Sequence, residues 1–144
     1  MDSLQIVTCS YQARTAAIVK IRKRVFQEEQ NISADLEFDG FDADAVHLLA
    51  YLENRAVATA RIREIDTDTA KLERLAVLPE YRKQGIGTRL AKTAIATIAR
   101  QGKSQVIVHA QAYIAPLYQQ LGFKEIGDRF SEAGIAHVKM ILPL

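Results

Sequence analysis

The pattern of hydrophobic and polar positions changes once from a strand pattern to a helix pattern within a single short segment. Residues 71–77 predict a buried strand, which Pro79 must end because proline has no backbone N–H to give to a ladder. Residues 88–101 predict a helix, since their apolar side chains recur at spacings of three and four. Gly85 and Gly87 lie between the two, so we expect the helix to begin at these glycines. The apolar positions are Leu72, Leu75, Ala76 and Val77 in the strand and Leu90, Ala91, Ala94, Ile95 and Ile98 in the helix.

Shorter periodic segments precede this unit. Residues 4–9 predict a first strand, and residues 13–28 predict a helix with an apolar stripe. Residues 31–44 are acidic and have no clear period, so we expect a loop with a short helical turn. Residues 47–52 and 56–65 predict an antiparallel hairpin that leads into the central strand.

Four further elements follow the long helix. Residues 105–110 predict a strand covered on both faces and parallel to the central strand, because the chain returns past a helix. A short helix at 114–121 and closing strands at 124–128 and 136–142 complete the chain. We therefore expect an α/β fold, with a mixed, mostly antiparallel central sheet of about six to seven strands and helices on both faces. Residues 1–144 form one expected domain.

The glycine loop itself predicts an anion site. A loop at a helix start directs several backbone N–H groups and the positive end of the helix dipole at one point. Arg82 and Lys83 add positive charge beside it, so phosphate is the expected ligand. The stretch lacks the lysine and hydroxyl residue of a P-loop, and Leu90 occupies the place of the third glycine of a dinucleotide fingerprint.

Two motifs together point to a family. Residues 82–87, Arg-Lys-Gln-Gly-Ile-Gly, resemble the Arg/Gln-x-x-Gly-x-Gly/Ala signature of the GNAT superfamily of acyl-CoA-dependent N-acetyltransferases. Residues 118–123 resemble the superfamily's Tyr-x-x-x-Gly-Phe segment, in which the tyrosine commonly serves as general acid. Segments near residues 24–30, 44–47, 109–111 and 130–140 resemble the ElaA-like branch, and the match covers almost the whole chain.

This resemblance implies a fold in which two parallel strands splay apart and acetyl-CoA binds along the exposed edge as a co-substrate. The pyrophosphate would rest on the backbone N–H groups of residues 82–88. The acetyl carbonyl would lie near residues 75–77, where a backbone N–H can stabilise an oxyanion. Gln111 stands where many members carry an asparagine that contacts the cofactor. The implied cofactor-binding residues are Leu75, Ala76, Val77, Arg82, Lys83, Gln84, Gly85, Ile86, Gly87, Thr88, Gln111 and Tyr118.

Two residues are catalytic candidates. Tyr118 would protonate the thiolate leaving group, since a phenol of pKa about 10 can give a proton to a thiolate of pKa about 8.5. The competing interpretation is a core tyrosine with a backbone partner. Glu73 would take the proton of the amine, although its carboxyl pKa would have to be raised. The alternative for Glu73 is a structural ion pair with Arg74 or Arg61.

Composition and charge exclude other classes of function. The net charge of +2, with basic and acidic residues interspersed, argues against a nucleic-acid surface. No apolar run approaches the roughly 20 residues of a membrane span, and a single cysteine, Cys9, fits a reducing compartment, so we expect a cytoplasmic protein. His47, His109 and His137 are not spaced as a metal site, and we expect no metal. The last two could line an acceptor pocket or make structural hydrogen bonds.

We therefore expect an N-acetyltransferase that transfers acetyl directly from acetyl-CoA to a primary amine of an unidentified small-molecule or peptide acceptor. The alternatives are a catalytically weak acyl-CoA sensor and a structural protein, which a test of CoA binding separates. The acidic residues Glu28, Glu29, Asp35 and Glu37 hint at a cationic acceptor. A homodimer is common in the superfamily and is expected here by analogy alone.

Overall fold

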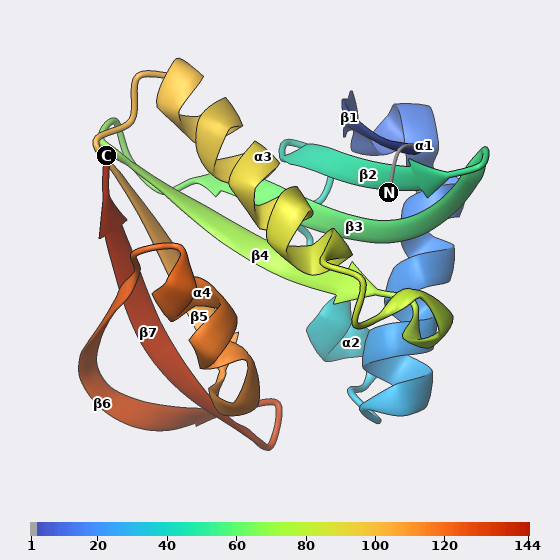
Figure 1. Ribbon diagram of the computed structural model, residues 1–144. Coiled ribbons are helices and arrows are strands. Elements are labelled where there is room, and N and C mark those ends of the chain that lie inside the picture. Colours follow the sequence, from blue (N-terminus) through green and yellow to red (C-terminus); the bar gives the residue numbers. More distant parts are fainter. Residues whose placement is uncertain (1–2) are drawn as a thin grey trace.

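The computed structural model describes residues 3–144 as a twisted seven-stranded sheet with helices on both faces (Figure 1). The strand order is β1-β2-β3-β4-β5-β7-β6, and every neighbouring pair is antiparallel except β4 and β5. The strands are β1 Leu4–Ser10, β2 Val46–Leu52, β3 Arg55–Glu64, β4 Thr69–Val77, β5 Gln105–Gln111, β6 Lys124–Glu132 and β7 Ile135–Pro143. The expected mixed, mostly antiparallel sheet is confirmed.

Helices cover the sheet on both sides. One face carries α3 Ile86–Arg100 and α4 Ala115–Gln120, and the opposite face carries α1 Tyr11–Arg22. A π-helical segment, η1 Lys23–Glu29, continues α1, and α2 Ala34–Glu37 is the expected short turn within the acidic loop. Two 3₁₀ turns, η2 Pro79–Tyr81 and η3 Ala112–Ile114, lead into the later helices. In the described residues no helix is long and apolar enough to cross a membrane.

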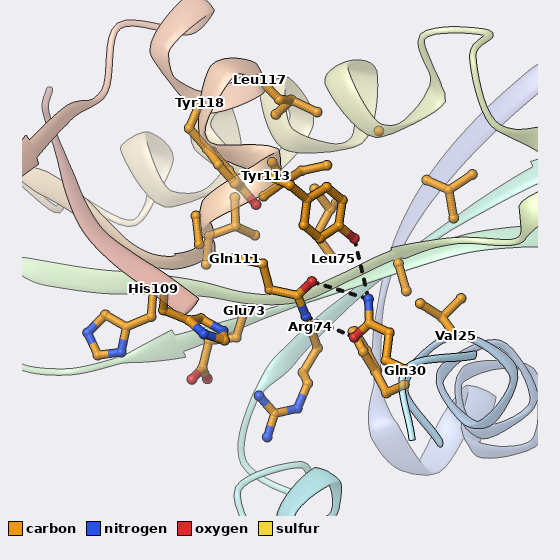
Figure 2. A pocket seen from close by; sticks show the side chains of 18 of the residues that line it. Val25, Gln30, Glu73, Arg74, Leu75, His109, Gln111, Tyr113, Leu117 and Tyr118 are labelled. Carbon is orange, nitrogen blue, oxygen red and sulfur yellow. Dashed lines mark hydrogen bonds between the residues drawn. The ribbon is translucent and has the colours of Figure 1, made fainter. Parts of the chain in front are cut away.

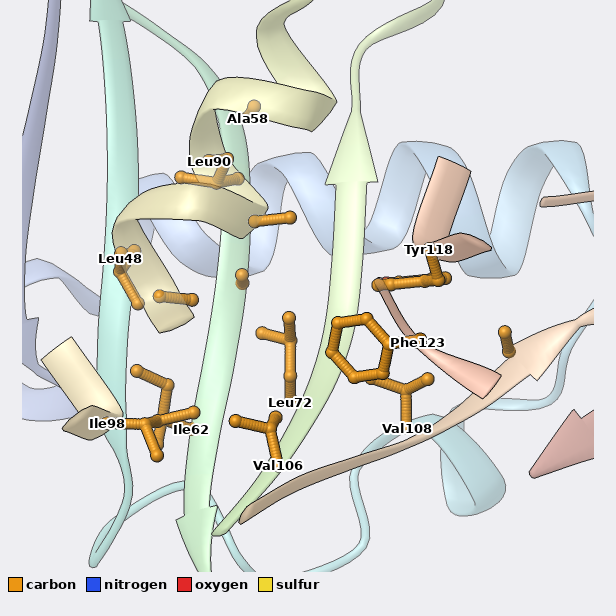
Figure 3. Close-up of a cluster of buried hydrophobic side chains, with 14 of the residues drawn as sticks. Leu48, Ala58, Ile62, Leu72, Leu90, Ile98, Val106, Val108, Tyr118 and Phe123 are labelled. Carbon is orange, nitrogen blue, oxygen red and sulfur yellow. The ribbon is translucent and has the colours of Figure 1, made fainter. Parts of the chain in front are cut away.

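Two hydrophobic cores follow from the alternation of side chains along the strands. Leu48 belongs to the cluster that contains side chains of α3 and α4, while its neighbour Leu49 belongs to the cluster that contains side chains of α1 on the other face. The larger core contains Leu90 and Ile98 of α3 and reaches Tyr118 of α4 (Figure 3). The helix pattern predicted for residues 88–101 therefore reports real burial against the sheet.

The element boundaries differ from the expected ones mainly at the first helix. It begins at Tyr11 rather than at residue 13, because the side chain of Ser10 accepts a hydrogen bond from the Ala13 N–H at 3.2 Å and caps the helix. The spacing of hydrophobic residues does not predict this contact, because the contact is made by a polar side chain. The closing strands are also longer than expected, since they join in a tight turn at Ala133 and Gly134.

The central sheet opens between β4 and β5. The two strands pair only from Thr69 to Lys71 on β4, although β4 continues to Val77 and β5 to Gln111. Beyond Lys71 the two strands diverge, while the other edge of β5 stays paired with β7 from Gln105 to Gln111. The expected splayed parallel pair is thus present, and the exposed edge of β4 faces the gap.

Candidate active site

A cavity of about 660 Å³ occupies the opening between β4 and β5 (Figure 2). Its wall is formed by η1, β4, the glycine loop, β5, α4 and the turn between β6 and β7. Of the predicted site residues, only Gln84 does not line it. Residues separated by up to about a hundred positions in the chain therefore converge on one cavity of the size that small-molecule sites have.

The glycine loop forms one end of the cavity. Lys83 and Gly85 have φ angles of 62° and 79°, in the left-handed region that favours glycine. Gly85 in this conformation is the last residue of the loop, and α3 begins at Ile86. In the part of the chain that the structure describes, the backbone N–H groups of residues 83–88 donate no hydrogen bond to another residue. These donors at a helix start are free to receive an anion.

Arg82 ties this loop to the first helix. Its guanidinium donates two hydrogen bonds of 2.6 Å to the carboxylate of Glu29 and one of 3.0 Å to the carbonyl of Val77. The hydrogen-bonded Glu29 raises the pKa of Arg82. The loop is thus held against η1, and Lys83, which has no ion pair with any described residue, keeps its charge free.

A β-bulge distorts β4 beside the cavity. Arg61 of β3 is paired with Glu73, while Thr59 is paired with Ala76, so two β4 residues oppose Ala60 alone. Arg74, the first of the two, has a φ of 54°, which is uncommon outside glycine. The bulge interrupts the ladder where β4 lines the cavity, at the position predicted to face an acetyl carbonyl.

Tyr118 projects from α4 at the centre of the cavity (Figure 2). The residue is 4% exposed, and its ring packs edge-to-face on Phe123 at 5.4 Å. Burial raises the pKa of Tyr118 well above its ordinary value, so the phenol is protonated at neutral pH. Its hydroxyl makes no hydrogen bond to any of residues 3–144, so the backbone partner that the core interpretation requires is absent.

Comparison with known proteins fits this geometry. The sequence matches the acetyltransferase (GNAT) domain over residues 9–144. The chain belongs to the GNAT acetyltransferase family. It is 40% identical to the protein YyaT of Bacillus subtilis over 125 residues, 85% of this chain and 84% of the relative. It is 30% identical to the protein ElaA of Escherichia coli over 128 residues, 86% of this chain and 84% of ElaA.

Solved structures share the GNAT fold of this chain closely. A crystal structure from Lactobacillus plantarum superposes with a TM-score of 0.90 at 27% identity and covers 99% of both chains. The crystal structure of Escherichia coli ElaA gives a TM-score of 0.84 at 26% identity, over 96% of this chain and 98% of ElaA. The resemblance to the ElaA-like branch that the motifs indicated is confirmed.

Glu73 lies in the wall of this GNAT cavity, but three cations hold its carboxylate. Arg61 donates to it at 2.9 and 3.1 Å, Arg63 at 2.9 Å, and the Lys71 Nζ lies 3.2 Å away. Burial acts to raise the pKa of Glu73, but these cations outweigh it and the pKa is lowered. The geometry therefore supports the ion-pair alternative, with Arg61 as partner rather than Arg74.

A buried network of arginines and carboxylates lies beyond Glu73, and sequence reasoning missed it. Arg22 and Arg61 are at most 1% exposed, and Asp42 accepts hydrogen bonds from both, at 2.6 and 3.0 Å. Arg22 also binds Glu37, and Arg61 also binds Asp39 at 2.8 Å. No periodicity signals such pairs, because each joins a strand or helix to the irregular loop before β2.

The four acidic residues expected to attract a cationic acceptor do not present free carboxylates to the cavity. Glu29 is held by Arg82, and Glu37, which is 2% exposed, is held by Arg22. Glu28 and Asp35 do not line the cavity. An attraction for cationic substrates must come from another part of the wall.

Gln111 joins the two sides of the cavity. Its amide nitrogen donates to the Gln30 side chain at 2.8 Å, and the Gln30 nitrogen donates back at 3.2 Å and to the Tyr113 hydroxyl at 3.4 Å (Figure 2). This pair connects β5 to the end of η1. Neither Gln30 nor Tyr113 was a predicted site residue, and the exposed position of Tyr113 gives no signal in sequence.

The remaining polar wall comes from β5, β7 and the turn before β7. His109 and His137 line the cavity, and so does Glu132, which the sequence did not single out. His47 does not line it, and its Nε2 lies 2.9 Å from the carbonyl of Asp42. Within residues 3–144, no group of three or more histidine, cysteine or acidic side chains is arranged to hold a metal ion.

Proposed function

We propose that the protein is an acetyl-CoA-dependent N-acetyltransferase that transfers acetyl directly to a primary amine of a small-molecule or peptide acceptor. The observation that carries the proposal is one continuous cavity with free backbone donors at one end and the unpartnered Tyr118 hydroxyl at its centre. A GNAT family acetyltransferase from Elizabethkingia anophelis, which shares the fold at a TM-score of 0.76 and 16% identity, was crystallised with acetyl-CoA bound.

The residues of this chain fit such a co-substrate. The N–H groups of residues 83–88 would receive its pyrophosphate, with Lys83 adding charge. Gly87, the second residue of α3, lines the cavity beside these donors and carries no long side chain that would reach the phosphate site. The open edge of β4 at residues 75–77 would pair with the pantetheine amides, as an extended peptide pairs with an exposed strand.

The transfer step then needs an oxyanion donor and an acid. The bulge at Arg74 places the backbone of Leu75 outside the regular ladder, where its N–H can stabilise the charge that develops on the carbonyl oxygen. Tyr118 donates its proton to the sulfur as the carbon–sulfur bond breaks. The phenol suits this role because burial keeps it protonated until a thiolate appears beside it.

Calorimetric titration with acetyl-CoA, followed by measurement of CoA release in the presence of a panel of primary amines, tests this function. We expect acetyl-CoA to bind and at least one amine to accelerate CoA release. Binding without any acceleration would favour the acyl-CoA sensor. The absence of binding would contradict both functions.

A further inference from the structure

Three side chains from different strands converge on the cavity wall opposite Tyr118's helix. Ala133 and Gly134, with φ angles of 53° and 76°, form the tight turn that joins β6 to β7 and places Glu132 at its base. His137 follows two residues into β7 and is paired with Gln111 of β5. His109 lies two residues before Gln111, on the same face of the sheet.

The polar atoms of this cluster face one another without a hydrogen bond. The Glu132 Oε1 lies 3.6 Å from the His109 Nδ1, and its Oε2 lies 3.5 Å from the His137 Nε2. The His137 Nδ1 lies 2.7 Å from the carbonyl of Ile135, which can only accept, so Nδ1 carries the hydrogen. In neutral His137 the Nε2 therefore presents a lone pair toward a carboxylate. Two acceptors that face each other require a proton or a cation between them.

Glu132 differs from the other carboxylates in the wall. Four carboxylates line the cavity within the described residues, and three of them, Glu37, Asp39 and Glu73, are paired with arginine. Among the described residues, Glu132 has ion-pair contacts within 4 Å only with the two histidines, and its side chain is about half exposed. The nearby His109 first, and then His137 and Lys71, lower the pKa of Glu132 against the effect of its burial, so it is a carboxylate at neutral pH.

One aromatic ring and two lysines lie around the cluster. Phe130 packs against both imidazoles, with ring centroids 5.2 Å from His109 and 5.8 Å from His137. Lys71 of β4 faces the cluster but is bound by Glu73, and Lys139 of β7 is the register partner of His109. The cluster therefore presents hydrogen-bond acceptors beside the Phe130 ring. The nearest lysine in the cavity wall, Lys71, is already paired with Glu73.

We propose that His109, Glu132 and His137 form the subsite that receives the ammonium group of the acceptor, and that His137 takes its proton. The inference rests on the proposed N-acetyltransferase activity and names the substrate class as primary amines that arrive protonated. The ammonium donates one hydrogen bond to Glu132 and one to the His137 Nε2. This assigns the proton-accepting role to an imidazole and leaves Glu73 as an ion-pair partner of Arg61.

Each proton that moves in the reaction has a donor and an acceptor among the ammonium, His137, Tyr118 and the leaving sulfur. One N–H proton of the ammonium moves to the His137 Nε2, where Glu132 stabilises the imidazolium. The freed nitrogen lone pair forms a bond to the thioester carbon, and the carbon–sulfur bond breaks with its electron pair on sulfur. Tyr118 gives its proton to that sulfur and regains one from the acetylated nitrogen. His137 then releases its proton to solvent.

Two isosteric thioethers test the subsite without knowledge of the natural acceptor. S-(3-aminopropyl)-CoA delivers an ammonium beyond the sulfur, and S-butyl-CoA delivers a methyl group of similar size. At pH 7.5 we expect calorimetry to show the aminopropyl compound binding at least about tenfold more tightly, a difference of about 1.4 kcal/mol. Glu132→Gln removes this preference. Glu125→Gln, which changes a carboxylate on the same strand outside the cavity, keeps it.

Turnover provides the readout for His137. In acetyl-CoA turnover with butylamine, His137→Gln lowers kcat about 100-fold without raising the KM for acetyl-CoA. Thermal unfolding checks that each variant is folded.

The outcomes separate this inference from the function on which it rests. Equal preference for the aminopropyl compound in the wild type and in Glu132→Gln overturns the subsite. A kcat of His137→Gln equal to that of the wild type overturns the proton-accepting role. Failure of both thioethers to bind any variant contradicts the proposed function itself.

Discussion

At the scale of single residues, Tyr118 carries the sharpest prediction. Tyr118→Phe removes only the hydroxyl, whose sole expected task is to protonate the leaving thiolate. We expect kcat for acetyl transfer to fall about 100-fold or more while the dissociation constant of acetyl-CoA stays within about twofold. Stopped-flow measurement of CoA release checks the rate, and calorimetry checks the affinity.

Tyr51→Phe is the matched control, because the Tyr51 hydroxyl accepts a hydrogen bond from Arg14 outside the cavity. It should leave kcat unchanged. Equal kcat values for Tyr118→Phe and the wild type would show that another group protonates the sulfur.

Glu73 carries a prediction about stability rather than rate. Glu73→Gln leaves Arg61, Arg63 and Lys71 without their shared carboxylate, and we expect the free energy of unfolding at pH 7 to fall by about 3 kcal/mol. The folded-state pKa of Glu73 is lowered, so its contribution is present above the unfolded pKa of about 4.3. That contribution is lost as the pH falls through the folded value.

Urea unfolding at pH 7 and pH 3 measures the difference, which should shrink at the lower pH. Glu64→Gln, an exposed carboxylate at the end of β3, is the control and should change stability by less than about 0.5 kcal/mol. A normal stability together with a large loss of kcat in Glu73→Gln would instead support Glu73 as the catalytic base.

The residues that line the cavity were predictable where one local sequence pattern marks them. The glycine loop and the Tyr118 segment were identified because backbone donors and a motif spacing are local properties. The fate of Glu73 was left open between base and ion pair, because its partners Arg61 and Arg63 come from another strand. Glu132 was missed, since its role depends on two histidines brought next to it by strand pairing.

At the scale of elements, the bulge in β4 makes its own prediction. Arg74→Gly and Arg74→Val both remove the guanidinium, but only valine resists a φ of 54°. We expect the valine variant to be less stable than the glycine variant by about 1–2 kcal/mol or more, as judged by urea unfolding. Because the proposed oxyanion donor, the Leu75 N–H, lies within this bulge, the valine variant should also lose more activity. Equal stability of the two would mean that the strand can flatten without cost.

Elements were predicted well because periodicity reports burial directly. The apolar run in β2 matches the two cores on the two faces of the sheet, and the helical spacing in α3 matches the larger of them. The bulge and the π-helical end of the first helix were not predicted. Both depend on contacts with neighbouring strands and loops, which leave no period in the sequence.

At the scale of the whole molecule, ligand binding should be visible as a localised change in hydrogen exchange. The N–H groups of residues 83–88 have no partner in the described chain, so they should exchange rapidly in the free protein. Saturating acetyl-CoA should slow them, together with residues 75–77, far more than it slows β1 and β2. Mass-spectrometric exchange with and without acetyl-CoA measures this, and a uniform change across the chain would contradict the assigned location.

Binding of the acetyl-CoA pyrophosphate at the glycine loop can be tested by one calorimetric comparison. A Cβ at Gly87 would lie 3.6 Å from Leu117 Cδ1 and from Val77 Cγ2, which are ordinary contacts, so the fold tolerates alanine there. Gly87→Glu instead directs a bulky anion at the phosphate site. We predict that the wild type and Gly87→Ala bind acetyl-CoA, and that Gly87→Glu loses at least about tenfold in affinity. Wild-type affinity in a folded Gly87→Glu variant, or no binding by the wild type, would show that the glycine loop does not receive the pyrophosphate.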